Sequence, residues 1–442
     1  MKLKISNGRV IDPANHIDDH LDIYIDNGLI VAVGKTPEAF IPDRVIDASD
    51  QIVCPGLVDL SARLGEPSQQ HASSIASETQ AAIKGGITTL CTPPDTDPII
   101  DSPAAVELLE DRATKAGSAN IYIIGALTQK LEGELLSEML ALKQAGCIGV
   151  SNGLNPIRNT LVLRRAMEYA ATLDLTVFIN AADPWLQSQG CIHEGMVSTR
   201  LGLGGIPEAA ETIAIARDIS LIEHSRVTAH FHNISSGKSA AMIKEAQERG
   251  LPITADVSPH HLHLSEHDIG NYDSLSHVIP PLRSTRDREQ LQQSLREGVI
   301  STISSHHHPL DNDAKLGPFA DTIPGISGLE TLLPLTLKLV DDDELSLQQA
   351  IASLTINPAR VLGLDAGHLN VGTKADICIF NPESHCECLP ENFVSAGKNS
   401  PFAGWHFRNE VSFTLLNGQV LYEREPNDLL SSQKTNNIRE SS

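Results

Sequence analysis

The chain has 442 residues, of which 41% are hydrophobic and 4% aromatic, and its formal net charge is −23. This length can bury a large core and can form more than one domain. The negative charge and the scarcity of aromatic stacking platforms argue against a nucleic-acid partner, and the charge also argues against anionic membranes.

The seven cysteines are scattered through the chain. Several lie in apolar stretches, which is typical of reduced, buried thiols. Cys386 and Cys388 are close together, but a zinc knuckle needs a second pair, and the sequence has none. The first residues lack the apolar segment of a signal peptide, and no apolar run approaches the roughly 20 residues of a membrane span. We therefore expect a cytoplasmic protein.

The two ends of the chain are rich in short, alternating strand patterns. Asn27-Gly28 and Asn417-Gly418 are typical hairpin turns. Because both ends have this texture, we predict one small β-sandwich built from residues 1–54 and 364–424. Residues 425–442 are polar, and we expect them to be a flexible tail. The predicted strands are Lys2–Ser6, Leu21–Ile25, Ile30–Val33, Ala375–Phe380, Val411–Leu416 and Val420–Tyr422.

Residues 55–363 have a different rhythm, in which short apolar runs alternate with helical segments. Eight such runs predict a parallel (β/α)8 barrel, the TIM-like architecture. In this fold the functional side chains follow the carboxyl ends of the strands. The predicted strands are Leu57–Leu60, Thr88–Cys91, Ile121–Ile124, Ile148–Val150, Thr176–Ile179, Arg226–His230, Ile253–Val257 and Ile300–Ser304.

Several motifs follow these strands in order. They include Pro55-Gly-Leu-Val-Asp59, Pro93-Pro-Asp95-Thr-Asp-Pro98, Pro259-His260-His261-Leu and Gly325-Ile-Ser-Gly328-Leu-Glu330. In these motifs the chain resembles the dihydroorotase branch of the amidohydrolases, and the resemblance covers nearly the whole chain. It implies a barrel of the metallo-dependent hydrolase type with a β-sandwich lobe.

The resemblance also implies that the metal-binding positions of this family have changed. Active relatives hold zinc with two alternating histidines after the first strand, a bridging carboxylate or carboxylated lysine, two further histidines and an aspartate that also acts as base. In this sequence those positions are Ser61, Arg63, Asn152, Asn180, Asn233 and Ser305. The two substrate-binding positions of the family, an arginine and an asparagine, are here Gly65 and Asp95.

These changes remove the chemistry of the family. Arg63 puts a fixed cation where zinc would sit, and a second cation nearby would be repelled. Without zinc, a bound water keeps a pKa near that of bulk water, and Ser305 cannot replace a carboxylate as base. We therefore predict no zinc, no catalytic residues and no hydrolase activity.

Two alternatives remain open at this point. A mononuclear metal site rebuilt from His230, His260 and His306 would allow an active cyclic-amide hydrolase, such as a dihydroorotase. A barrel mouth containing Arg63 could instead hold an anionic pyrimidine or nucleotide. The run His306-His307-His308 does not itself predict a metal site, because consecutive strand residues point to opposite faces.

The resemblance further implies partners. Non-catalytic dihydroorotase homologues of several bacteria assemble with the catalytic chain of aspartate carbamoyltransferase, and homodimers are common in the family. The sequence thus favours a structural subunit in pyrimidine synthesis, and this partner is inferred from the family alone.

Overall fold

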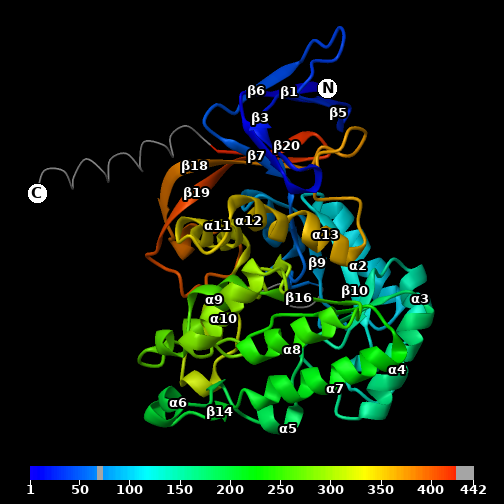
Figure 1. The fold of residues 1–442 in the computed structure, drawn as a ribbon, viewed down its shortest axis with the longest axis vertical. Coiled ribbons are helices and arrows are strands. Elements are labelled where there is room, and N and C mark those ends of the chain that lie inside the picture. The colour runs from blue at the N-terminus through cyan, green and yellow to red at the C-terminus, as the bar shows by residue number, and fades with distance from the viewer. Residues whose placement is uncertain (67–72, 425–442) are drawn as a thin grey trace, which may run out of the picture.

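The computed structural model describes residues 1–66 and 73–424. It consists of a barrel and a β-sheet lobe stacked at one end of it (Figure 1). The predicted fold class is confirmed. The predicted flexible tail, residues 425–442, lies outside the described residues, and the predicted domain boundaries stay a prediction.

The barrel is built from eight parallel strands, which run in chain order around the sheet. Each strand overlaps one of the apolar runs seen in the sequence. The predicted strand Arg226–His230 begins three residues too early, because Arg226 has a positive φ and caps the preceding helix. Such continuous apolar runs are typical of parallel strands that are covered on both faces, and all six residues of β9 are buried. The strands are β8 (Leu57–Asp59), β9 (Ile87–Thr92), β10 (Asn120–Ala126), β11 (Gly149–Ser151), β12 (Thr176–Ile179), β15 (Ala229–Phe231), β16 (Ile253–Val257) and β17 (Thr302–Ile303).

The first and last strands approach each other just beyond their carboxyl ends. Ala62 and His307 form a parallel bridge, in which the His307 amide donates to the Ser61 carbonyl and the Arg63 amide donates to the His307 carbonyl, each at 3.0 Å. The barrel is therefore nearly closed. The seam between its first and last strands lies beside Ser61, Arg63 and Ser305, which the resemblance singled out.

Helices surround the barrel and connect its strands. The helix α1 begins at a Ser74 capping box, and α2 ends at Gly117 with a positive φ, so both ends follow ordinary capping rules. The helices are α1 (Ile75–Lys84), α2 (Pro103–Ala116), α3 (Met139–Gln144), α4 (Thr160–Thr172), α5 (Pro184–Gln187), α6 (Met196–Leu201), α7 (Ala209–Ser225), α8 (Gly237–Glu248), α9 (Pro259–His263), α10 (Thr285–Arg296), α11 (Leu332–Asp341), α12 (Leu347–Leu354) and α13 (Ile356–Leu362). A small sheet pairs β13 (Ile192–His193) with β14 (Gly205–Ile206).

The lobe contains strands from both ends of the chain. Its six-stranded sheet has the order β20-β19-β18-β7-β2-β3, and its four-stranded sheet has the order β5-β4-β1-β6. Leu3, Ile25, Ile377 and Leu415 are fully or almost fully buried in one shared core. The strands are β1 (Lys2–Ser6), β2 (Arg9–Asp12), β3 (Ile17–His20), β4 (Ile23–Asp26), β5 (Leu29–Val33), β6 (Arg44–Asp47), β7 (Ile52–Pro55), β18 (Ile377–Glu387), β19 (His406–Leu416) and β20 (Gln419–Glu423).

Among the helices described, none combines the length and the apolar character that crossing a bilayer requires.

Candidate functional site

The candidate site is the mouth of the barrel, where the strands end at their carboxyl termini. Ser61 and Arg63 follow β8, Asn180 follows β12, Asn233 follows β15 and Ser305 follows β17. The fold therefore brings most of the positions inferred from the resemblance to one end of the molecule.

Ser305, which stands at the family's base position, is held by the first strand. Its backbone amide donates to Asp59 Oδ1 at 2.8 Å, its hydroxyl donates to Asp59 Oδ2, and the hydroxyl also lies 3.3 Å from the Ser61 carbonyl oxygen. Complete burial raises the pKa of Asp59 to about 6, although the bonds from Ser305 act in the opposite direction. Asp59 and Ser305 therefore join the two edges of the barrel at its seam.

Arg63 and Asp95 form an ion pair across the mouth. The guanidinium Nη2 lies 2.7 Å from Asp95 Oδ2, and Nε lies 3.2 Å from the same oxygen. The side chains are only 12% and 17% exposed. Two residues that the resemblance assigns to a metal-ligand position and a substrate position thus pair with each other, and Asp95 neutralises the cation within the chain. This arrangement removes the reason to expect an anionic ligand at Arg63.

Asn152 is used by the loops around it. Its Oδ1 accepts from the Thr128 hydroxyl at 2.6 Å, and its Nδ2 donates to the carbonyls of Leu131 and Asn155 at 3.1 and 2.7 Å. Both N–H groups and the oxygen of this amide are therefore hydrogen-bonded within the chain. Asn152 stabilises the loop after β11.

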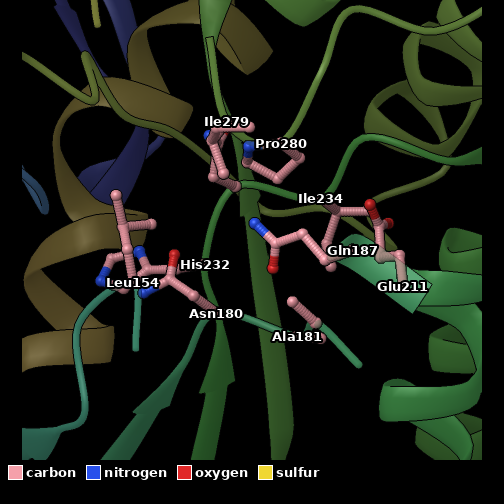
Figure 2. Close-up of a pocket in the computed structure, with 11 residues that line it drawn as sticks. Leu154, Asn180, Ala181, Gln187, Glu211, His232, Ile234, Ile279 and Pro280 are labelled. Atoms are coloured by element: carbon pink, nitrogen blue, oxygen red, sulfur yellow. The ribbon is translucent and has the colours of Figure 1, made fainter. Parts of the chain in front are cut away.

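Asn180 and Asn233 line a small cavity together with His232 (Figure 2). The picture shows Asn180 and His232 on one side of it, and Gln187 and Glu211 on another. The Asn180 Nδ2 donates to the Gly153 carbonyl at 3.1 Å, but its Oδ1 and both amide atoms of Asn233 are buried without a partner. The cavity volume is about 20 Å³, which is room for about one water molecule.

Gly65, at the family's substrate-arginine position, has a backbone that suits glycine. Its φ is +73°, and a Cβ atom there would lie 1.8 Å from the Ser73 hydroxyl oxygen. No side chain fits at this position while Ser73 keeps its place, so the loss of the arginine is matched by the local packing.

The six family positions therefore offer no ligand set for zinc. They supply hydroxyls, amides and a guanidinium, whereas zinc in proteins is bound by imidazole, thiolate or carboxylate. The residues present at these positions do not fit a divalent cation.

The three histidines of the alternative metal site do not converge in the structure. His260 Nε2 lies 2.8 Å from the Ser258 hydroxyl, and the rings of His260 and His306 are 6.3 Å apart. Burial, with further contributions from neighbouring histidines and Arg63, holds the pKa values of His260 and His306 well below their usual range. His230 turns instead toward the neighbouring strand.

His230, His232 and Asp256 form a buried cluster at the ends of β15 and β16. His232 Nδ1 lies 2.7 Å from Asp256 Oδ2, and His230 Nε2 lies 3.3 Å from the same oxygen. Burial alone would raise the pKa of Asp256, but the two histidines hold it well below its usual range. Within residues 1–66 and 73–424, this is the group of three side chains whose geometry suits a metal ion.

The remaining members of the histidine run have separate partners. His307 Nε2 lies 2.9 Å from Glu78 Oε2, and His307 Nδ1 accepts from the Gly328 amide at 3.0 Å. His308 Nδ1 lies 3.1 Å from the Pro324 carbonyl. His307 and His308 therefore serve as hydrogen-bonding residues within the chain.

Sequence reasoning missed two features of this site. Asp256 was not singled out, although His230 and His232 alternate on one strand and Asp256 lies near the end of the next. The pairing of Arg63 with Asp95 was also not foreseen, because the two residues lie on loops 32 positions apart. The sequence did offer one indication of this pair: Arg63 and Asp95 carry opposite charges, and each replaces a residue that is usual in the family.

Comparisons with known proteins show which family this chain belongs to. Residues 50–239 match the model of the dihydro-orotase-like family, and residues 306–422 match that of an amidohydrolase family. A dihydroorotase-like protein of Pseudomonas aeruginosa is 45% identical over 423 residues, covering 96% of this chain and 100% of its own length. The chain belongs to the dihydroorotase-like amidohydrolases. Within this family, a protein of Geobacter sp. (strain M21) that is 39% identical over 423 residues, again covering 96% of this chain and 100% of its own length, is named dihydroorotase.

Solved structures support the fold. The L-hydantoinase (dihydropyrimidinase) of Arthrobacter aurescens superposes with a TM-score of 0.86 over 95% of this chain and 96% of its own, at 22% sequence identity. At that identity the likeness concerns the fold of this dihydroorotase-like chain alone.

Proposed function

We propose that this protein is a catalytically inactive dihydroorotase homologue. In this proposal it acts in the cytoplasm as a structural subunit for the assembly of aspartate carbamoyltransferase in pyrimidine synthesis, and it turns over no substrate.

 The carbamoyltransferase catalytic chain and a second copy of this chain are the proposed partners.

The observation that carries this proposal is the ion pair between Arg63 and Asp95. In the family pattern, a metal ligand and a substrate-binding residue occupy these two positions. Here the two side chains bind each other at 2.7 Å and are mostly buried. A charge pair of this kind competes with both a divalent ion and a substrate, because either would have to displace one of the two side chains from its partner.

The small cavity beside Asn180 and Asn233 supports the same proposal. The described cavity beside Asn180 and Asn233 holds about 20 Å³, whereas pockets for small-molecule ligands usually measure roughly 300 to 1,000 Å³. Outside this cavity, the position that the resemblance gives to the family's base is Ser305, which is bonded to Asp59. The barrel thus keeps the fold of a hydrolase, while Arg63, Asn152 and Ser305 at its mouth are bonded to other residues of the chain.

The test combines a turnover assay with a binding assay. We expect the purified protein to show no ring opening of dihydroorotate and no ring closure of carbamoyl aspartate, at protein concentrations where an active dihydroorotase is easily measured. We expect it to elute with the aspartate carbamoyltransferase catalytic chain of the same organism in gel filtration. The matched control is that catalytic chain run alone. Turnover by the pure protein, or separate elution of the two chains, would overturn the proposal.

A second candidate is an active hydrolase of cyclic amides with a rebuilt metal site. Two observations favour it: a relative that is 39% identical is named dihydroorotase, and the cluster of His230, His232 and Asp256 has metal-binding geometry. This candidate requires turnover that rises with added Zn²⁺ and is lost in His232→Gln. The same turnover assay, run with and without Zn²⁺, separates the two functions.

A further inference from the structure

The buried cluster at the ends of β15 and β16 is not one of the family's metal positions. The resemblance puts the metal ligand of this segment at Asn233, whereas the cluster uses His230 and His232 from β15 and its end, and Asp256 from β16. His230 and His232 are two residues apart, so they lie on the same side of the extended chain. The three side chains are 0%, 6% and 0% exposed.

The distances within the cluster suit a metal ion. The ligand atoms of all three residues lie within 4.8 Å of one another. His230 Nε2 is 3.3 Å from Asp256 Oδ2, but it is a buried atom without a hydrogen-bond partner. Two ligand atoms that bind one tetrahedral zinc ion at about 2.0 Å are themselves roughly 3.3 Å apart. The distance of 3.3 Å between His230 Nε2 and Asp256 Oδ2 is therefore the distance expected between two ligands of one zinc ion.

The surroundings orient these ligands as a metal site requires. His230 Nδ1 lies 2.7 Å from the Thr254 hydroxyl, which leaves Nε2 facing Asp256. The Ser304 hydroxyl donates to Asp256 Oδ2 at 2.9 Å, and the backbone N–H of Asn233 donates to Oδ1. A second hydrogen bond on each ligand of this kind is usual around protein-bound metals, because it fixes the ring or carboxylate orientation.

A fourth ligand has room beside His232. This residue lines the cavity of about 20 Å³, together with Asn180 and Asn233, whose buried amide atoms include several without partners. About one water molecule fits there. Three protein ligands and one water would complete a tetrahedral set.

We propose that His230, His232 and Asp256 bind one divalent transition-metal ion of the zinc class, at a place distinct from the family's metal site. Binding replaces the contact of 2.7 Å between His232 and Asp256 and releases the proton that it holds. The ion joins β15 to β16. The site stabilises the barrel, and it does not depend on hydrolysis. Our prediction that zinc is absent is therefore restricted to the six family positions.

The test measures metal content and thermal stability of the whole protein, with Zn²⁺ and Co²⁺ as probes. We expect about one Zn²⁺ per chain after dialysis against metal-free buffer, a Co²⁺ derivative with the visible absorption of a tetrahedral site, and a melting temperature that rises on adding Zn²⁺. His232→Gln and Asp256→Asn should each weaken Zn²⁺ binding at least about tenfold. His306→Asn, which changes a buried histidine outside the cluster, is the matched control and should bind Zn²⁺ like the wild type.

Two outcomes would overturn this inference: a wild-type protein that binds no Zn²⁺ or Co²⁺, or a metal content that is the same in His232→Gln and Asp256→Asn as in the wild type. If both variants fail to fold, the wild-type Co²⁺ spectrum decides, since a spectrum of six-coordinate Co²⁺ contradicts the site. Metal bound without turnover supports both this inference and the proposed function. Turnover removes the proposed function and leaves the metal site standing.

Discussion

Arg63→Ala and Asp95→Ala are each expected to lower the free energy of unfolding by about 3 kcal/mol, because each leaves one buried charge without its partner. The pair is 12% and 17% exposed, so water screens it only weakly. In the double variant both charges are gone, and its loss should be smaller than the sum of the single losses. Denaturant unfolding of the four proteins measures this coupling directly.

The matched control for this cycle is the ion pair between Arg249 and Glu223. Its side chains are 45% and 50% exposed, and its atoms are 3.3 Å apart. Exposed pairs contribute roughly 0 to 1 kcal/mol, so alanine at either position should have little effect. If the coupling of Arg63 with Asp95 is no larger than that of the control pair, the buried ion pair does not hold the mouth together, and the main support for the proposed function is lost.

Glu78→Ala is expected to have the largest effect on stability, a loss of about 3 to 5 kcal/mol. Glu78 is fully buried on α1, and its carboxylate contacts His307 at 2.9 Å, the Ser395 hydroxyl at 2.6 Å and the Ala396 amide at 3.0 Å. One side chain thus joins a helix of the barrel, the barrel seam and the loop before β19. Removing it leaves several buried polar groups unsatisfied. Denaturant unfolding measures the loss, and Glu107→Ala on the exposed face of α2 is the matched control, expected to stay within about 0.5 kcal/mol of the wild type.

The same residue predicts a dependence of stability on pH. Burial alone would raise the pKa of Glu78, but its bonds to His307 and Ser395 lower it below the usual 4.5. A carboxyl group with a lowered folded-state pKa contributes stability that is present above its unfolded pKa and is lost as the pH falls through the folded one. We expect the stability advantage of the wild type over Glu78→Gln to be complete near neutral pH and to shrink below about pH 4.5. An advantage that stays constant from pH 7 to pH 3 would contradict this role.

The sequence by itself determined the barrel and its strands. Each apolar run, from Leu57–Leu60 to Ile300–Ser304, overlaps a strand, because a strand covered on both faces is rich in apolar residues. The alternating ends of the chain likewise predicted the sheets of the lobe. The resemblance then located Ser61, Arg63 and Ser305 at the mouth, since the carboxyl ends of parallel strands meet on one face.

Only the tertiary structure decided what these residues contact. Arg63 meets Asp95, Ser305 meets Asp59, and His230 meets Asp256 because neighbouring strands bring together positions that are far apart in the chain. Local patterns of residues carry the period of a strand or helix, but they do not carry the direction of a side chain inside a cavity. The pairing of charges and the grouping of metal ligands depend on that direction, and so they became visible only in the folded barrel.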